Sequence, residues 1–207
     1  TAIASGEVRF NFDKNITAPR NPFTVNSKIF EFKNISDADS VAGATYKKPD
    51  AANETEALFY YGRTYAPHYT GRMSGFNGDV FYGVYCNGCN TTDYAAIGST
   101  QPLPNNDNWF VNIVHNAGMG QVTLYAPNSA TTTVSVNTPV VNGIENIRMQ
   151  STVPGTDLIK MHVPSWLLFN ATDPSATTND FLVTFTSNTS WGGKAPNKQG
   201  KDDGVGS

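Results

Sequence analysis

Charged side chains are scarce in this chain. Lys, Arg, Asp and Glu make up 15% of its 207 residues, whereas about a quarter is usual for a soluble domain. The net charge is −3 and no run of Lys or Arg occurs, which argues against a nucleic-acid partner. No apolar run approaches the roughly 18 residues of a membrane-spanning helix, so no membrane span is predicted. Thr, Ser, Asn and Gly supply the polarity instead, as is typical of extracellular β proteins.

Recognisable catalytic motifs are also missing. There is no GxSxG, no phosphate-binding loop and no dinucleotide fingerprint, so a non-enzymatic protein is predicted. A Ser/His/Asp constellation needs no sequence proximity, which leaves a secreted hydrolase as a second alternative. Only three histidines occur, His68, His115 and His162, and no zinc-binding spacing unites them. Each is expected to satisfy a local hydrogen bond.

Short runs of alternating apolar residues dominate the chain. Residues 7–13 alternate cleanly, with Val8, Phe10 and Phe12 on one face, which predicts a half-buried strand. Gly, Pro, Asn and Asp separate the runs, and no segment shows a long helical period. The pattern predicts an all-β fold, an antiparallel two-sheet β-sandwich of jelly-roll or immunoglobulin-like type, with about nine or ten strands. The strand-like runs are residues 7–13, 23–32, 58–66, 79–86, 109–115, 121–126, 131–136, 144–149, 157–163 and 181–186.

The length fits one large sandwich. We expect residues 1–190 to form that single domain. From Trp191 the chain is rich in Gly, Lys and Asp and has almost nothing to bury, so residues 191–207 are expected to be a flexible tail or linker.

Both cysteines lie in the tetrapeptide Cys86-Asn87-Gly88-Cys89. The leading interpretation is a structural disulfide that fixes the turn after a strand, since Gly88 supplies the backbone freedom of so tight a ring. A redox-active dithiol would usually sit at a helix N-terminus, and a metal site needs two further ligands. These two interpretations and free thiols stay open as alternatives.

Six Asn-x-Ser/Thr sequons permit glycosylation and export without demanding either. They begin at Asn15, Asn34, Asn53, Asn90, Asn170 and Asn188.

Two oxygen-rich loops are weak calcium candidates, through Asp37 and Asp39 in one and Asp107 in the other. Calcium takes six to eight oxygen ligands, often from such loops. Neither loop matches an EF-hand, and turn formation by Asx side chains is the leading interpretation of both. Apart from calcium, no cofactor is expected.

Tyrosine and tryptophan are frequent near the middle of the chain. Tyr65, Tyr69 and Trp109 are the candidates for a platform that stacks on a sugar ring. Tyrosines on strands more often form cross-strand pairs and core edges, so packing is the competing interpretation.

Five segments follow one another in a distinctive order: LFYYGRTYAPHY, GDVFYGVYCNGCN, NWFVNIVHN, VPSWLLFN and WGGK. They resemble a poorly characterised β module of large bacterial secreted or cell-surface, adhesin-like proteins, and the resemblance spans roughly Leu58 to Lys194. It implies an exported multidomain β protein with a surface or adhesive role, and it supplies no catalytic residues.

These observations predict a non-enzymatic structural or adhesive module located outside the cell or at its surface. Its expected partners are copies of itself or neighbouring domains of surface proteins. As a filament subunit it would donate its N-terminal strand to a neighbour, with Val8, Phe10 and Phe12 filling pockets there. The first alternative is a carbohydrate-binding module that uses surface aromatics, with or without calcium, and whose partners are glycans.

Overall fold

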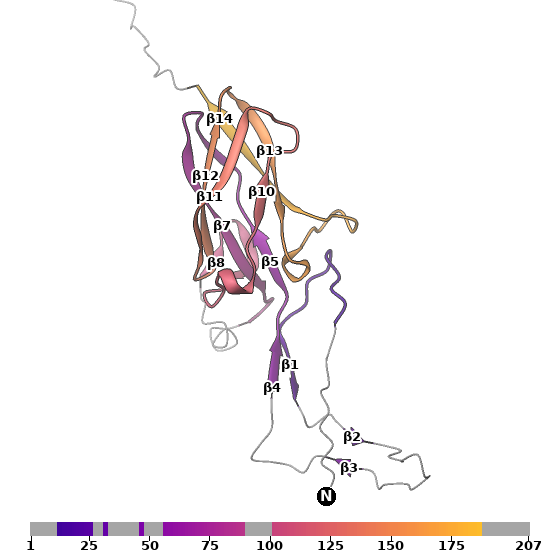
Figure 1. Ribbon diagram of the computed structural model, residues 1–207. Helices are drawn as coiled ribbons and strands as arrows, with labels where there is room; N and C mark the ends of the chain where they lie inside the picture. The colour runs from indigo at the N-terminus through magenta and orange to yellow at the C-terminus, as the bar shows by residue number, and fades with distance from the viewer. Residues whose placement is uncertain (1–11, 27–30, 33–45, 48–55, 90–100, 188–207) are drawn as a thin grey trace, which may run out of the picture.

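A computed structural model describes residues 12–26, 31–32, 46–47, 56–89 and 101–187 of the chain. Two β-sheets face each other in this part and form a sandwich (Figure 1). No α-helix occurs among these described residues, and two short 3₁₀ turns connect strands: η2 (Ala117–Met119) and η3 (Ser165–Leu167). The prediction of an all-β, two-sheet sandwich is therefore confirmed.

The larger sheet has six strands, arranged around the long central strand β7 (Phe76–Tyr85). Phe81 pairs with both Ile144 and Tyr65, so β12 and β5 lie on opposite sides of β7. The hydrogen-bonded order of strands is β11–β12–β7–β9–β8. Strand β5 pairs with β7 off this path and forms an edge of the sheet. The bounds are β5 (Gly62–Tyr65), β8 (Pro102–Leu103), β9 (Asn106–Val111), β11 (Thr132–Val141) and β12 (Ile144–Ser151).

The smaller sheet has four strands in the order β10–β13–β14–β6. All strand pairs of both sheets are antiparallel except β14 with β6, which run parallel. The strands are β6 (Tyr69–Arg72), β10 (Thr123–Tyr125), β13 (Gly155–His162) and β14 (Asn179–Thr186).

Asn142 and Gly143 join β11 to β12 in a tight hairpin. Both residues have positive φ, 53° and 74°, which is the geometry that an Asn-Gly turn favours. A Cβ atom at Gly143 would lie 2.3 Å from the carbonyl oxygen of Asn112. Only glycine therefore fits here, where the hairpin packs against the end of β9.

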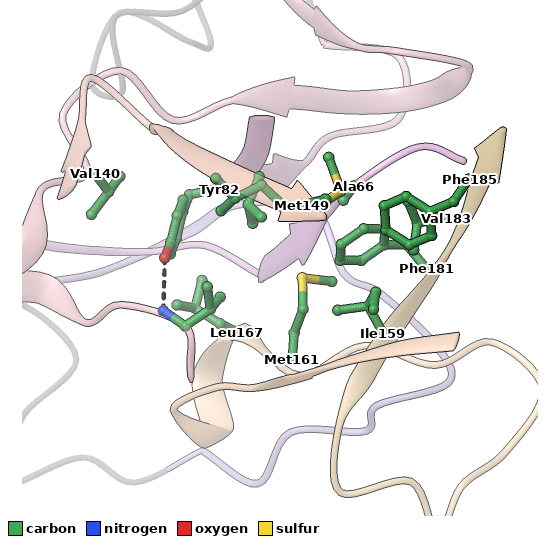
Figure 2. Packing of buried hydrophobic residues seen from close by; sticks show 13 residues of the cluster. Ala66, Tyr82, Val140, Met149, Ile159, Met161, Leu167, Phe181, Val183 and Phe185 are labelled. Carbon is green, nitrogen blue, oxygen red and sulfur yellow. Dashed lines mark hydrogen bonds between the residues drawn. The ribbon is translucent and has the colours of Figure 1, made fainter. Parts of the chain in front are cut away.

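The main core lies between the two sheets (Figure 2). The larger sheet contributes side chains such as Tyr82 and Met149, and the smaller sheet contributes Ile159, Met161 and Val183. A second cluster, centred on Trp109, packs on the other face of the larger sheet, where Phe169 covers it. The two clusters follow from alternation along β5, since Gly62 and Thr64 are buried on one face while Arg63 and Tyr65 lie on the other.

Two short ribbons stand outside the sandwich. Strand β1 (Phe23–Asn26) pairs with β4 (Glu56–Phe59), and β2 (Glu31–Phe32) pairs with β3 (Tyr46–Lys47). Figure 1 shows β1 and β4 projecting below the two large sheets, with β4 leading upward into β5. The first strand of the sandwich therefore begins at Gly62. The division into a domain of residues 1–190 and a tail of residues 191–207 stays a prediction.

Some boundaries differ from the sequence expectations. Residues 23–32 form β1 and β2 rather than one strand, and β9 ends at Val111 rather than at His115. Phe12 and Asp13 lie outside any strand, while the rest of the expected 7–13 strand falls on residues that the structure does not describe. Strand β6 forms between the expected strands 58–66 and 79–86, where the sequence predicts none, because its parallel pairing with β14 outweighs the low strand propensity of Gly71.

Candidate functional site

The segment of residues 12–22, here called the N-terminal arm, lies along the open edge of β5. Lys14 Nζ donates hydrogen bonds to the carbonyl oxygens of Gly62 and Trp166, both at 2.7 Å. The Tyr61 hydroxyl donates to the Asn15 carbonyl at 2.5 Å, and the Asn170 amide donates to the Ile16 carbonyl at 2.9 Å. The arm is therefore attached to the sandwich by separate polar contacts and belongs to neither large sheet.

These contacts complete the edge of the larger sheet. The Tyr61 carbonyl accepts from the Tyr85 amide, so the next carbonyl, that of Gly62, points away from β7, as does that of Thr64. Lys14 binds the Gly62 carbonyl at 2.7 Å, and Asn179 Nδ2 binds the Thr64 carbonyl at 3.3 Å and its hydroxyl at 2.6 Å. Side chains thus occupy an edge that would otherwise accept another strand.

Lys14 is held in a partly dehydrated position. Its ammonium lies 4.2 Å from the centre of the Tyr61 ring. Burial, and secondarily the nearby Arg63 charge, lower the pKa of Lys14 to about 7. In its neutral form the amine has two N–H groups, which match the two carbonyls that it contacts. The contact of the arm with β5 is therefore compatible with either protonation state near neutral pH.

Aromatic rings gather where the arm meets the β1–β4 ribbon. Phe12 lies edge-on to Phe23 and Phe59, with centroids 5.1 Å and 4.8 Å apart. Phe12 and Phe23 nevertheless remain 51% and 42% exposed. A cavity of about 700 Å³ lies between the arm, the ribbon and η3. This end of the molecule thus combines an exposed apolar patch with incomplete packing.

Arg63 lies on the outer face of β5, beside a second cavity of about 480 Å³ between β5, β14 and residues 169–171. Its guanidinium carbon lies 4.9 Å from each of the ring centres of Tyr65, Trp109 and Phe169. Nη1 donates to Asn106 Oδ1 at 3.0 Å, while the buried Nε has no partner. Burial lowers the pKa of Arg63 to about 10, still high enough to keep its charge at neutral pH.

Tyr82, Glu145 and His115 form a polar cluster inside the main core. The Tyr82 hydroxyl donates to Glu145 Oε2 and accepts from the Val122 amide at 2.9 Å; the latter bond is the dashed line in Figure 2. Glu145 is fully buried and its Oε1 has no partner, and burial raises its pKa. His115 stacks on Tyr82 and donates Nε2–H to the Gly120 carbonyl at 2.8 Å, and burial lowers its pKa. Neither of the two cavities is lined by this cluster.

The three sugar-stacking candidates do not share one exposed face. Tyr65 and Trp109 meet around Arg63, but Trp109 is only 5% exposed. Tyr69 packs against the main core, and its hydroxyl exchanges hydrogen bonds with the backbone of Asp79. These are the contacts of packing residues, and a sugar-stacking role for the three stays a prediction.

The other candidate residues are scattered. Asn15 is exposed and Asn170 half-buried, and the side-chain oxygen of each accepts from the threonine two residues on. Asp107 is exposed. Within the described part of the chain no group of three His, Cys, Asp or Glu side chains could hold a metal ion. The remaining glycosylation, calcium and strand-exchange candidates lie outside that part: Asn34, Asn53, Asn90, Asn188, Asp37, Asp39, Val8 and Phe10.

Cys86 and Cys89 lie at disulfide distance, with their Cα atoms 5.6 Å apart. Cys86 is buried at the end of β7 beside Val84, and Gly88 has a φ of 72° in the turn between them. The adjoining Asn87 backbone is bound on both sides by the Asn21 side chain, at 2.9 Å and 2.8 Å. The tight cysteine turn is thereby linked to the arm.

The histidines lie apart, each with its own local contact. His68 Nε2 lies 2.8 Å from the Thr184 hydroxyl, while His162 stacks on Tyr125.

Sequence reasoning overlooked Lys14, Arg63 and the Glu145 cluster. A usable signal existed for Arg63 alone, since Tyr61 and Tyr65 flank it at spacing two and so share its face.

Comparisons with known proteins identify no family. No protein-family model and no curated protein matches the chain. One solved structure, the crystal structure of domains 4 and 5 of the S-layer protein SbsC, aligns over 80% of this chain and 70% of that chain, with 8% identity and a TM-score of 0.31. A TM-score this low does not establish a shared fold or function. Among the residues that the structure describes, no helix is long and apolar enough to cross a membrane.

Proposed function

We propose that this chain is a non-enzymatic extracellular structural module that assembles with copies of itself by exchanging its N-terminal arm. The observation that carries the proposal is the position of the arm on the open edge of β5. It is held there by Lys14 and a few other polar contacts rather than by strand pairing. The arm of a neighbouring copy can make the same contacts, and exchange of an identical element is a low-cost route to assembly.

The sequence before the arm favours an intermolecular role. In the sequence before Phe12, Val8 and Phe10 continue the apolar alternation that ends at Phe12. Phe12 stays 51% exposed even in contact with its own ribbon. A partner copy that receives this segment can bury these side chains and pair their backbone in the strand-addition mode.

A structural rather than a catalytic role agrees with the chemistry present. The buried acid–base cluster of Tyr82, Glu145 and His115 stacks and bonds internally within the core. Low charge, abundant Thr, Ser and Asn, and a cysteine pair at disulfide distance support an extracellular location.

The test is the assembly state of the full chain, measured by light scattering over a concentration series with negative-stain imaging. The expected result is regular oligomers or filaments that disappear when residues 1–20 are deleted, which removes the Lys14, Asn15 and Ile16 contacts, while a soluble, folded protomer remains. Phe12→Ser should weaken assembly, whereas the matched control Leu182→Ser, at an exposed apolar position on β14, should not. Polymers that survive the deletion, or a wild-type protein that stays monomeric, would refute the proposal.

A further inference from the structure

We propose that the cavity beside Arg63 binds a carboxylate carried by a monoanionic ligand. The site lies between β5 and β14, shares no lining residue with the cavity beneath the arm, and does not depend on the assembly proposed above. Its central feature is an arginine that has positive charge and unused donors but no acidic partner among the residues that the structure describes.

Most hydrogen-bond donors of Arg63 have no partner among the described residues of the protein. A guanidinium has five N–H donors in a planar fork. One donor reaches Asn106 Oδ1 at 3.0 Å, and the buried Nε has no partner. The Asn106 amide is itself oriented, because its Nδ2 donates to the Pro104 carbonyl at 2.8 Å. The fork is therefore fixed in place with donors left for the paired oxygens of a carboxylate, a group that its planar geometry matches.

The surroundings strengthen this preference. Three aromatic rings at 4.9 Å hold the guanidinium in a partly dehydrated setting, where a charge-assisted hydrogen bond is stronger than in water. An incoming carboxylate would form the ion pair that no acidic side chain in the described part of the chain makes with Arg63.

The cavity also limits what else the ligand carries. Asp180, exposed on β14, lines the same space, so a polyanion would meet like charge. Leu158, Met161 and Phe181 supply an apolar wall. A volume of about 480 Å³ accommodates a single sugar acid or one acidic side chain. Both present the same carboxylate chemistry.

The experiment titrates the full chain with two acids and their neutral counterparts, followed by backbone amide NMR shifts. The probes are glucuronate against glucose, and N-acetylglutamate amide against N-acetylglutamine amide. At least one acid should bind saturably and shift residues around Arg63, while its neutral counterpart should not. Arg63→Gln should weaken that binding at least about tenfold, and the exposed control Arg72→Gln should leave it unchanged. The acid that binds more tightly identifies the source of the carboxylate.

Arg63→Lys provides a second variant that retains the charge but loses the planar fork, and it too should weaken binding. The proposal is overturned if neither acid binds the wild-type chain at millimolar concentration, or if the neutral counterparts bind equally well. Undiminished binding by a folded Arg63→Gln protein also overturns it. If that variant does not fold, the wild-type comparison of acid with neutral probe and the Arg63→Lys variant still decide.

Discussion

Replacing Glu145 with glutamine should remove a loss of stability that the wild-type protein shows as the pH rises. Glu145 is fully buried, its Oε2 accepts from the Tyr82 hydroxyl, and its Oε1 has no partner. Burial raises the pKa of this carboxyl above 4.5, the ordinary value for glutamic acid. Glutamine keeps an oxygen for Tyr82 and nearly the same volume, but has no proton to release.

The direction of this pH effect on stability follows from proton binding in the folded and unfolded states. Between pH 4.5 and the raised pKa, the unfolded chain has lost the proton of Glu145 while the folded protein still holds it. The folded state therefore binds more protons, and its free energy of unfolding falls as the pH rises, by at most about 1.4 kcal/mol per pH unit for one group. His115 acts in the opposite sense below 6.5, since burial lowers its pKa and only the unfolded state gains a proton there.

Urea denaturation followed by tryptophan fluorescence, repeated from pH 4 to pH 8, measures both effects. Subtracting the Glu145→Gln curve from the wild-type curve cancels the contribution of His115. The difference should decline as the pH rises above about 4.5 and then level off. Parallel curves for wild type and Glu145→Gln would show that Glu145 is not buried as described.

Three further changes test the packing. Tyr82→Phe leaves Glu145 Oε2 and the Val122 amide without their partner, so the free energy of unfolding should fall by about 2–4 kcal/mol; a loss below 1 kcal/mol in urea titrations contradicts this network. Gly62→Ala would place a Cβ 2.6 Å from Trp166 Cζ3. The overpacking should lower the free energy of unfolding by about 1–3 kcal/mol and lower the melting temperature. An unchanged melting temperature argues against the contact of η3 with β5. Replacing both cysteines with serine should cost about 2 kcal/mol by the loop-entropy argument, and reducing agent should then have no further effect on the double variant.

Much of the sandwich could be predicted from the sequence because alternation is a local signal. Residues 157–163 and 181–186 alternate clearly, and they correspond to β13 and β14. The parallel partner of β14 could not be predicted in this way. Strand β6 contains Gly71 and follows a Pro, and only the register with residues 183–186 makes it a strand.

The site residues were harder to foresee, since their contacts span long distances in sequence. Lys14 meets carbonyls 48 and 152 positions away, and nothing near Lys14 indicates either contact. Trp109 was a candidate for sugar stacking, yet Phe169 and Tyr85 pack against its ring. Cys86 and Cys89 were predictable as a pair because the turn that joins them is itself local.

The most direct test of arm exchange is whether the isolated arm binds in trans. A synthetic peptide of residues 1–20 is titrated into the protein that lacks residues 1–20, and binding is measured by calorimetry. The account predicts saturable one-to-one binding that is weakened when the peptide carries Lys14→Met, since that change removes both hydrogen bonds to the Gly62 and Trp166 carbonyls. No binding to a folded acceptor, or equal binding of the Lys14→Met peptide, would contradict the central claim that the β5 edge receives the arm of another copy.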